Sequence, residues 1–177
     1  ASFEGFYNLG NAYAALARDR EAIEAYDRAI DLRTDRSDYF YNRGIVLKKL
    51  GEDEKALADF DRVLQLDPRH ADALNNRGVI FLSRANVKRA LENFDRAVRE
   101  NAKHLPAWKN LAAAHLAGDS PEKALPVLEH ALKLAPKDPD ILARLGDAWT
   151  SKNRFDKAMA FYKKALERAT TPDQQAE

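Results

Sequence analysis

Apolar and small residues recur along the chain with a helical spacing. Phe40, Gly44 and Leu47 stand at i, i+4 and i+7, which places three side chains on one face of an α-helix. We therefore predict a first amphipathic helix, helix A, that returns every 34 residues. Its central small residue is found at Gly10, Gly44, Gly78, Ala112 and Gly146.

A second stripe follows each helix A. In Ala56, Phe60 and Val63 a small residue precedes a large one by four positions, and another apolar residue follows three positions later. This spacing predicts a second amphipathic helix, helix B. Small residues let two helices approach closely while a large side chain fills the space beside them, so a bulky replacement would overpack the contact.

The two stripes define five copies of one 34-residue unit without insertion or deletion. Stacked repeats share one continuous core, so we predict a single all-α array over residues 3–172 with almost no strand. The predicted repeats span 3–36, 37–70, 71–104, 105–138 and 139–172, and a polar tail follows at 173–177. Positions are numbered below from one to thirty-four within each repeat.

Several residues mark the expected helix ends. Gly51 after Leu50, Gly118 after Ala117, and Asn153 are predicted to stop helix A, and Asn153 tolerates the left-handed conformation at a helix end. Ser120 and Pro121 indicate an N-cap followed by a first-turn proline. Pro126 lies past the first turn of its helix B, where it removes one backbone hydrogen bond and should bend the helix slightly.

Charge and composition limit the classes of partner. Lysine and arginine number 29 against 28 acidic residues, giving a net charge of +1, so we expect no nucleic-acid partner. No stretch has the ~18 consecutive apolar residues of a membrane span, so we expect no direct membrane insertion. The chain has no cysteine, which excludes disulfides and fits both a reducing cytoplasm, the favoured location, and a cysteine-poor secreted protein.

The chain begins inside a helical pattern, so we expect a fragment of a longer protein whose targeting signals, if any, lie outside it. A designed or trimmed chain is the alternative origin.

The recurring residues resemble the tetratricopeptide repeat family. They match its pattern of a large residue at position four, Gly or Ala at eight, an aromatic at eleven, Ala at twenty, an aromatic at twenty-four and Ala at twenty-seven. The chain departs from that pattern at Arg43 and Arg77, where leucine is usual, and at His115, where an aromatic is usual. The closing proline is replaced at Thr34, Ala102 and Thr170.

The resemblance implies antiparallel helix pairs stacked in a right-handed superhelical solenoid. Helix A of each repeat would line a concave groove that binds a protein or peptide. On helix A, positions two, five, six, nine, twelve and thirteen face away from the stripe that packs. The candidate peptide-binding residues on that face are Tyr7, Asn8, Asn11, Tyr41, Asn42, Lys48, Asn75, Asn76, Lys109, Asn110 and Arg144.

Two interpretations of the asparagine column at position six stand side by side. A side-chain amide both donates and accepts hydrogen bonds, so one amide per repeat can bind the backbone of an extended peptide. The same asparagines can instead brace the turn of a neighbouring repeat. Similarity to tetratricopeptide superhelices with an asparagine ladder favours the first interpretation somewhat. The column comprises Asn8, Asn42, Asn76 and Asn110.

Relatives that bind a C-terminal carboxylate use lysine, asparagine and arginine at fixed positions of three repeats. This chain has Tyr7 where the first lysine is needed and Asp72 where another cation is needed. We therefore expect no carboxylate clamp. A ligand of some basic character would better suit the acidic residues Glu4, Asp38, Asp72 and Asp140.

Arg43 and Arg77 occupy a partly inward position. A half-buried charge normally requires a partner, and we predict ion pairs with Asp27 and Asp61 of the preceding helix B. A role of these arginines as ligand anchors is the less favoured alternative.

No residues are predicted to perform catalysis or to hold a metal or cofactor. His70 and His104 fall in turns between repeats, and His115 and His130 lie on different helix positions. None of the four has a second metal ligand close in sequence. No phosphate-binding glycine loop and no activated nucleophile is recognisable, so we predict that the chain is not an enzyme.

The favoured function is a protein-interaction scaffold. The first alternative is the substrate-recognition arm of a larger enzyme, for example a glycosyltransferase, whose catalytic domain lies outside this chain. The second is a self-assembling scaffold, because apolar residues such as Phe161 or Leu166 would be exposed at the end of the last repeat and permit end-to-end self-association.

Overall fold

The computed structural model describes residues 2–170; the predicted tail 173–177 and the last two residues of the predicted array lie outside the described residues. Ten α-helices cover the described part of the chain. They are α1 (Phe3–Ala15), α2 (Asp19–Leu32), α3 (Ser37–Lys49), α4 (Asp53–Leu66), α5 (Ala71–Ser83), α6 (Val87–Glu100), α7 (Leu105–Ala117), α8 (Pro121–Leu134), α9 (Pro139–Ser151) and α10 (Phe155–Thr170). The odd-numbered helices are the predicted A helices and the even-numbered ones the B helices.

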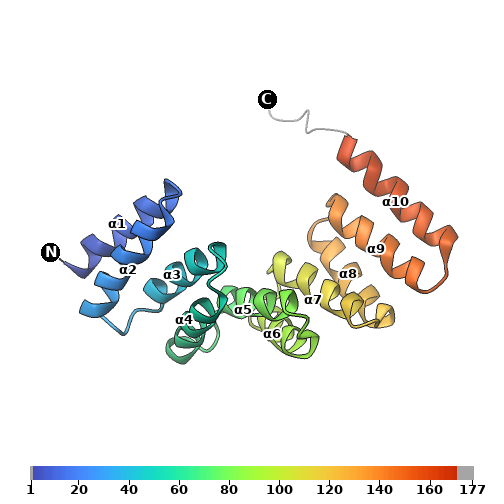
Figure 1. Cartoon of the computed structure of the whole chain (residues 1–177). Helices are drawn as coiled ribbons and strands as arrows, with labels where there is room; N and C mark the ends of the chain where they lie inside the picture. Colours follow the sequence, from blue (N-terminus) through green and yellow to red (C-terminus); the bar gives the residue numbers. More distant parts are fainter. Residues whose placement is uncertain (1, 171–177) are drawn as a thin grey trace.

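The helix pairs lie side by side in an arch (Figure 1), with α1 and α10 at opposite ends of the arch. Each helix contacts its neighbours in sequence, and each A helix also contacts the A helix of the next repeat. No such contacts join the B helices among the described residues. The A helices therefore line the inner face of the array. The prediction of an all-α helical solenoid is confirmed.

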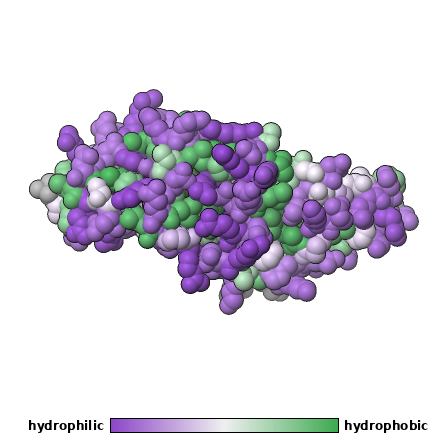
Figure 2. Space-filling model, turned by 90° about the horizontal axis from the view of Figure 1, so that it is seen from below, coloured by the Kyte–Doolittle hydropathy of each residue, from purple (hydrophilic) through white to green (hydrophobic). Residues whose placement is uncertain are grey.

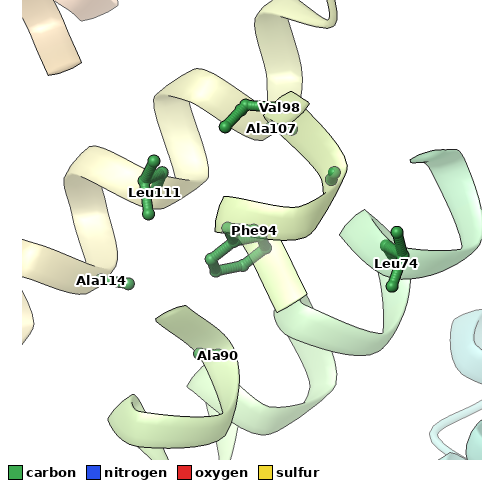
Figure 3. Packing of buried hydrophobic residues seen from close by; sticks show 8 residues of the cluster. Leu74, Ala90, Phe94, Val98, Ala107, Leu111 and Ala114 are labelled. Atoms are coloured by element: carbon green, nitrogen blue, oxygen red, sulfur yellow. The ribbon is translucent and has the colours of Figure 1, made fainter. Parts of the chain in front are cut away.

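The core runs from one repeat into the next. Phe94 of α6 is fully buried between Leu74 of α5 and Leu111 of α7 (Figure 3). Alanines on the same helices, Ala90 and Ala107, are also fully buried. Because one aromatic ring contacts both its own repeat and the following one, neither repeat has a core of its own.

Small residues at position eight leave room for the large residue at position twenty-four. A Cβ atom added to Gly78 would lie 2.6 Å from Cε1 of Phe94, which is closer than real atoms approach. The same conflict would occur between Gly10 and Tyr26. In the fourth repeat, where the larger Ala112 replaces glycine, the partner is the smaller Leu128. The expected overpacking is thus confirmed.

The turn from helix A to helix B has the same backbone geometry in every repeat. Position fifteen has a positive φ each time, and the following N–H bonds to the carbonyl oxygen of position eleven. This is the Schellman helix end. Helix α7 ends at Ala117, as predicted, and its C-cap Gly118 has φ −91°, while Asp119 takes the left-handed conformation. The five residues at position fifteen are Ala17, Gly51, Ala85, Asp119 and Asn153.

Position thirty-four is the N-cap of the following helix A, and its side chain makes the capping hydrogen bond for α5, α7 and α9 but not for α3, where the residue is Arg36. The Nδ1 atoms of His70 and His104 accept hydrogen bonds from the backbone N–H groups of Ala73 and Ala107, at 3.2 and 3.0 Å. Asp138 caps α9 in the same way. These two histidines therefore hold helix ends.

The fourth helix B meets the sequence expectations in part. Pro121 begins α8, as predicted, but the Ser120 side chain makes no capping hydrogen bond and its Oγ donates to the carbonyl oxygen of Gly118 at 3.3 Å. Pro126 lies inside α8, which continues to Leu134.

The surface seen from below the view of Figure 1 is mostly hydrophilic, with hydrophobic residues visible between charged ones (Figure 2). No helix in residues 2–170 is long and apolar enough to cross a membrane.

Replacement of Ala85 by glycine tests the strain at position fifteen. Ala85 has φ 56°, where a Cβ costs about 1–2 kcal/mol, part of which is offset by the greater freedom of glycine in the unfolded chain. We expect Ala85→Gly to raise the free energy of unfolding by about 0.5 kcal/mol in urea titrations. Ala160→Gly, at an exposed position inside α10, is the control and should lower it by about 1 kcal/mol. A loss of stability in both variants would contradict the account.

Candidate binding surface

The inner face of the first two repeats carries a small hydrogen-bond network. The Asn42 side-chain Nδ2 donates to the Tyr7 hydroxyl at 2.9 Å and to Asn11 Oδ1 at 3.0 Å. The hydroxyl of Tyr26, which comes from helix B, also donates to Asn11 Oδ1, at 2.9 Å. Burial raises the pKa of Tyr26 to about 12, so its hydroxyl remains a donor at neutral pH.

The asparagines at position six make the same contact at three successive junctions. Each donates its amide hydrogen to the residue at position five of the preceding repeat. The pairs are Asn42 with Tyr7, Asn76 with Tyr41 at 3.3 Å, and Asn110 with Asn75 at 2.9 Å. The column therefore braces neighbouring repeats through its Nδ2 atoms, but at side chains of the preceding helix A and not at the turn that the second interpretation named.

The last junction replaces the amide pair with charges. Lys109 Nζ lies 2.7 Å from Asp140 and 3.1 Å from Asp138, and Arg144 Nε lies 3.1 Å from Asp140. Burial alone raises the pKa of Asp140, but the hydrogen bonds and charges of Lys109 and Arg144 outweigh it and hold that pKa below its ordinary value. Asp140 is therefore ionised and joins positions five and six across the junction.

The predicted site residues differ in how far a ligand can reach them. Asn75 and Asn76 are buried, with 8% and 9% of their surface exposed, and Lys48 Nζ donates to Asn76 Oδ1. Asn8 is exposed at the start of the array. The others are half-buried along the inner face: Tyr7, Asn11, Tyr41, Asn42, Lys48, Lys109, Asn110 and Arg144. Their binding of a peptide stays a prediction.

A hollow of about 230 Å³ lies on the inner face between α1 and α3. Asn11, Asn42 and the Tyr26 ring line it together with apolar side chains. Those apolar side chains are Ala14, Ile45 and Val46. The hollow is smaller than the pockets that hold drug-sized molecules, and its mixture of amide and apolar groups suits one side chain of a larger partner.

Sequence reasoning placed Asn11 and Asn42 on the groove-facing side of helix A, but it predicted no hollow there and did not single out its apolar lining. The signal that could have found it is the small Ala14, which stands where the repeats that follow have larger residues at position twelve: Lys48, Leu82, Leu116 and Thr150.

Three of the four acidic residues expected to suit a basic ligand already have partners. Arg36 Nη2 lies 3.1 Å from Asp38, and His104 Nε2 lies 2.9 Å from Asp72. Asp140 is held by Lys109 and Arg144. A basic ligand would compete with these internal contacts.

The predicted ion pairs of Arg43 and Arg77 are confirmed. Arg43 Nη1 lies 2.6 Å from Asp27, and Arg77 pairs with Asp61. The structure adds a contact within the same repeat, because Arg43 also donates two hydrogen bonds to Asp59, at 2.6 and 2.8 Å. Burial alone lowers the pKa of Arg43, but the two aspartates outweigh it and raise that pKa.

A second cavity of about 520 Å³ lies between α2 and α4 with α3 behind it. Arg43, Asp27 and Asp59 line it beside residues of both charges, including Arg20, Glu24 and Lys55. Basic and acidic side chains both line the cavity, and Arg43, Asp27 and Asp59 already pair with one another, so the cavity has no dominant charge for a ligand of one sign.

The described residues contain no group of three or more His, Cys, Asp or Glu side chains that could hold a metal ion.

The arch of helix pairs, with its inner face of A helices, defines a helical-repeat scaffold. The chain belongs to the tetratricopeptide repeat family: models of this repeat match residues 3–35, 37–70, 81–139 and 115–176. No curated protein matches the sequence.

Solved structures of repeat proteins share the fold. MamA residues 41 to the end from Desulfovibrio magneticus RS-1 is 23% identical, with a TM-score of 0.90 and coverage of 97% of each chain. YrrB, described as a tetratricopeptide repeat protein with an unusual peptide-binding site, is 21% identical with a TM-score of 0.80, over 96% of this chain and 86% of that one. PilF from Pseudomonas aeruginosa is 18% identical with a TM-score of 0.83, over 96% and 78%.

Removal of Arg43 tests its role as an internal ion-pair partner. Asp59 is 4% exposed, so Arg43→Leu leaves a buried carboxylate without its partner and should cost about 3–5 kcal/mol in urea unfolding. Adding Asp59→Val copies the Leu111 and Val127 pair of the fourth repeat and should recover most of that loss. Asp27→Ala, at a half-exposed carboxylate, is the control and should cost less than about 1 kcal/mol.

The loss of unfolding free energy in Arg43→Leu should also depend on pH. Burial raises the pKa of Asp59 in the folded protein, and Arg43 opposes that rise. A carboxyl group with a raised folded-state pKa is destabilising once it ionises, so the deficit of the variant should grow as the pH rises from about 4 to 7. A deficit that is constant over this range would contradict the assignment.

Proposed function

We propose that this chain is a protein-interaction scaffold that binds an extended segment of a partner protein along its inner face, centred on the hollow between α1 and α3. The observation that carries the proposal is the hollow itself, where the amides of Asn11 and Asn42 border apolar Ile45 and Val46. An apolar side chain of the partner would enter it and bury its surface there.

The side-chain amide of Asn42 would bind the partner through its oxygen atom, because its nitrogen atom is already used in contacts within the array. The Nδ2 atom of Asn42 is bonded to Tyr7 and Asn11, which fixes the plane of the side chain before a ligand arrives. Its Oδ1 atom is then the group that accepts a hydrogen bond from a backbone N–H of the partner. A preordered amide loses little conformational entropy on binding, so the bracing and the binding interpretations of the column are compatible.

The proposal is for binding rather than catalysis, in keeping with a repeat family that generally forms non-catalytic scaffolds. Recognition of a substrate for a separate catalytic domain remains the alternative, and the sequence surrounding this chain in its gene would decide it.

Selection of peptides from a random library tests the proposal directly. The immobilised chain should enrich peptides that share one large apolar residue. Ile45→Lys places a charge in the hollow and should weaken the best peptide at least ~10-fold in isothermal titration, equivalent to ~1.4 kcal/mol. Val79→Lys, the same helix position one repeat further on, is the matched control and should leave the affinity nearly unchanged. Equal losses in both variants, or enrichment without an apolar residue, would overturn the proposal.

Asn42→Ala separates the two roles of the column. Loss of its two hydrogen bonds should lower the free energy of unfolding by about 1–2 kcal/mol. Titrations well below the melting temperature should also show weaker binding of the selected peptide. A stability loss with unchanged affinity would make the column purely structural.

A further inference from the structure

The outer face of α10 is an apolar surface that the array covers in every earlier repeat. Phe155, Met159 and Tyr162 stand at i, i+4 and i+7, with 58%, 54% and 39% of their surface exposed. Residues equivalent to Tyr162 in the earlier repeats are almost fully buried, because the next helix A covers them. They are Tyr26, Phe60, Phe94 and Leu128, each at most 1% exposed.

The sequence expectation of exposed apolar residues at this end is confirmed for Leu166, which is 65% exposed, and is wrong for Phe161. Phe161 is half-buried, because it packs against the core formed by α8 and α9. The exposed stripe lies one residue away, on the face that would meet a further helix A.

The opposite end of the array exposes the face of a helix A that a preceding helix B covers in the later repeats. Gly5, Leu9, Ala12 and Leu16 stand at i, i+4, i+7 and i+11 along α1 and its C-cap, and Leu9 and Leu16 are 43% and 68% exposed. One repeat later, the equivalents of Gly5 and Ala12 are Tyr39 at 1% and Val46 at 4% exposure. Those positions are buried wherever a helix B precedes them.

The internal junctions show which residues of the two faces would meet. Position fourteen of helix A contacts position seventeen of the preceding helix B: Arg84 lies 3.2 Å from Asp53. In the next junction a Cβ on Gly118 would lie 3.1 Å from Val87. The corresponding residues at the two ends of the array are Leu16 and Phe155. An internal ion pair is thus replaced by two large apolar residues.

A hollow of about 220 Å³ lies on the α1 and α2 end of the array, and it offers a second place where α10 of another copy would fit. Leu9, Tyr13 and Ala25 line it, with the charged residues Glu21, Glu24 and Arg28 beside them. In the first internal junction the corresponding space is lined by Ile23 and Asp27 of the preceding helix B. The equivalents of those two residues on α10 are Met159 and Lys163. Met159 would meet the apolar lining, and Lys163 would approach a rim where Glu21 and Glu24 outnumber Arg28.

We propose that copies of this chain join end to end, with α10 of one copy seated on α1 and α2 of the next. The contact has the geometry of a junction between two repeats inside one chain. The helix pairs of the second copy would therefore continue the array of the first. It joins two different surfaces, and such a heterologous contact leaves a free face at each end. This association is independent of peptide binding on the inner face.

Sedimentation velocity over increasing protein concentration tests the proposal. The unaltered chain should form species of increasing mass as its concentration rises, and this association should persist at high salt because the contact is mainly apolar. Leu16→Glu and Phe155→Glu should each remain monomeric. Both sites are exposed, so thermal unfolding followed by circular dichroism should show an intact fold. Leu134→Glu, at an exposed leucine of α8 away from both faces, should associate like the unaltered chain.

Mixing the two monomeric variants makes the test specific. Leu16→Glu keeps an intact α10 face and Phe155→Glu keeps an intact α1 face, so an equimolar mixture should form a one-to-one dimer and nothing larger. An unaltered chain that stays monomeric up to its solubility limit would overturn the proposal. Association that Phe155→Glu abolishes and Leu16→Glu preserves would overturn it too, because two α10 faces would then meet.

Discussion

The structure depends on one steric constraint, the contact between a small residue at position eight and a large residue at position twenty-four. The ring of Phe94 lies where a side chain on Gly78 would have to be, and this fixes how closely α5 and α6 approach. The same ring is covered by α7. The contact therefore sets the spacing of the two helices within a repeat and the position of the next repeat against them. Repetition of this contact at a fixed interval produces the arch.

The polar groups of the inner face follow from that spacing. Because consecutive A helices are held in contact, position six of one repeat lies beside position five of the repeat before it, and Asn42 bonds to Tyr7. The hollow between α1 and α3 forms where Ala14 is too small to fill the same gap. Stability and the proposed function therefore share side chains, and a ligand would meet groups that the array has already oriented.

The sequence predicted what depends on spacing and missed what depends on local detail. Helices, repeats and the Arg43–Asp27 pair follow from a fixed interval, so they could be predicted. The second partner, Asp59, had a detectable signal: arginine at position seven occurs with Asp or Asn at twenty-three, and leucine there with Ala, Val or Phe. The left-handed Ala85 had none, because alanine rarely adopts that conformation and only the repeat geometry imposes it. The hollow depends on how several side chains pack together, which no spacing rule contains.

A double-mutant cycle on Gly78 and Phe94 tests the central constraint most directly. In the unaltered background Gly78→Ala should lower the free energy of unfolding by about 1–3 kcal/mol, because the new Cβ overlaps the ring. With Phe94→Leu, which copies the Ala112 and Leu128 pair, the same change should be neutral or stabilising by up to about 1 kcal/mol, since alanine favours helix over glycine. An equal effect of Gly78→Ala in the two backgrounds would contradict the account.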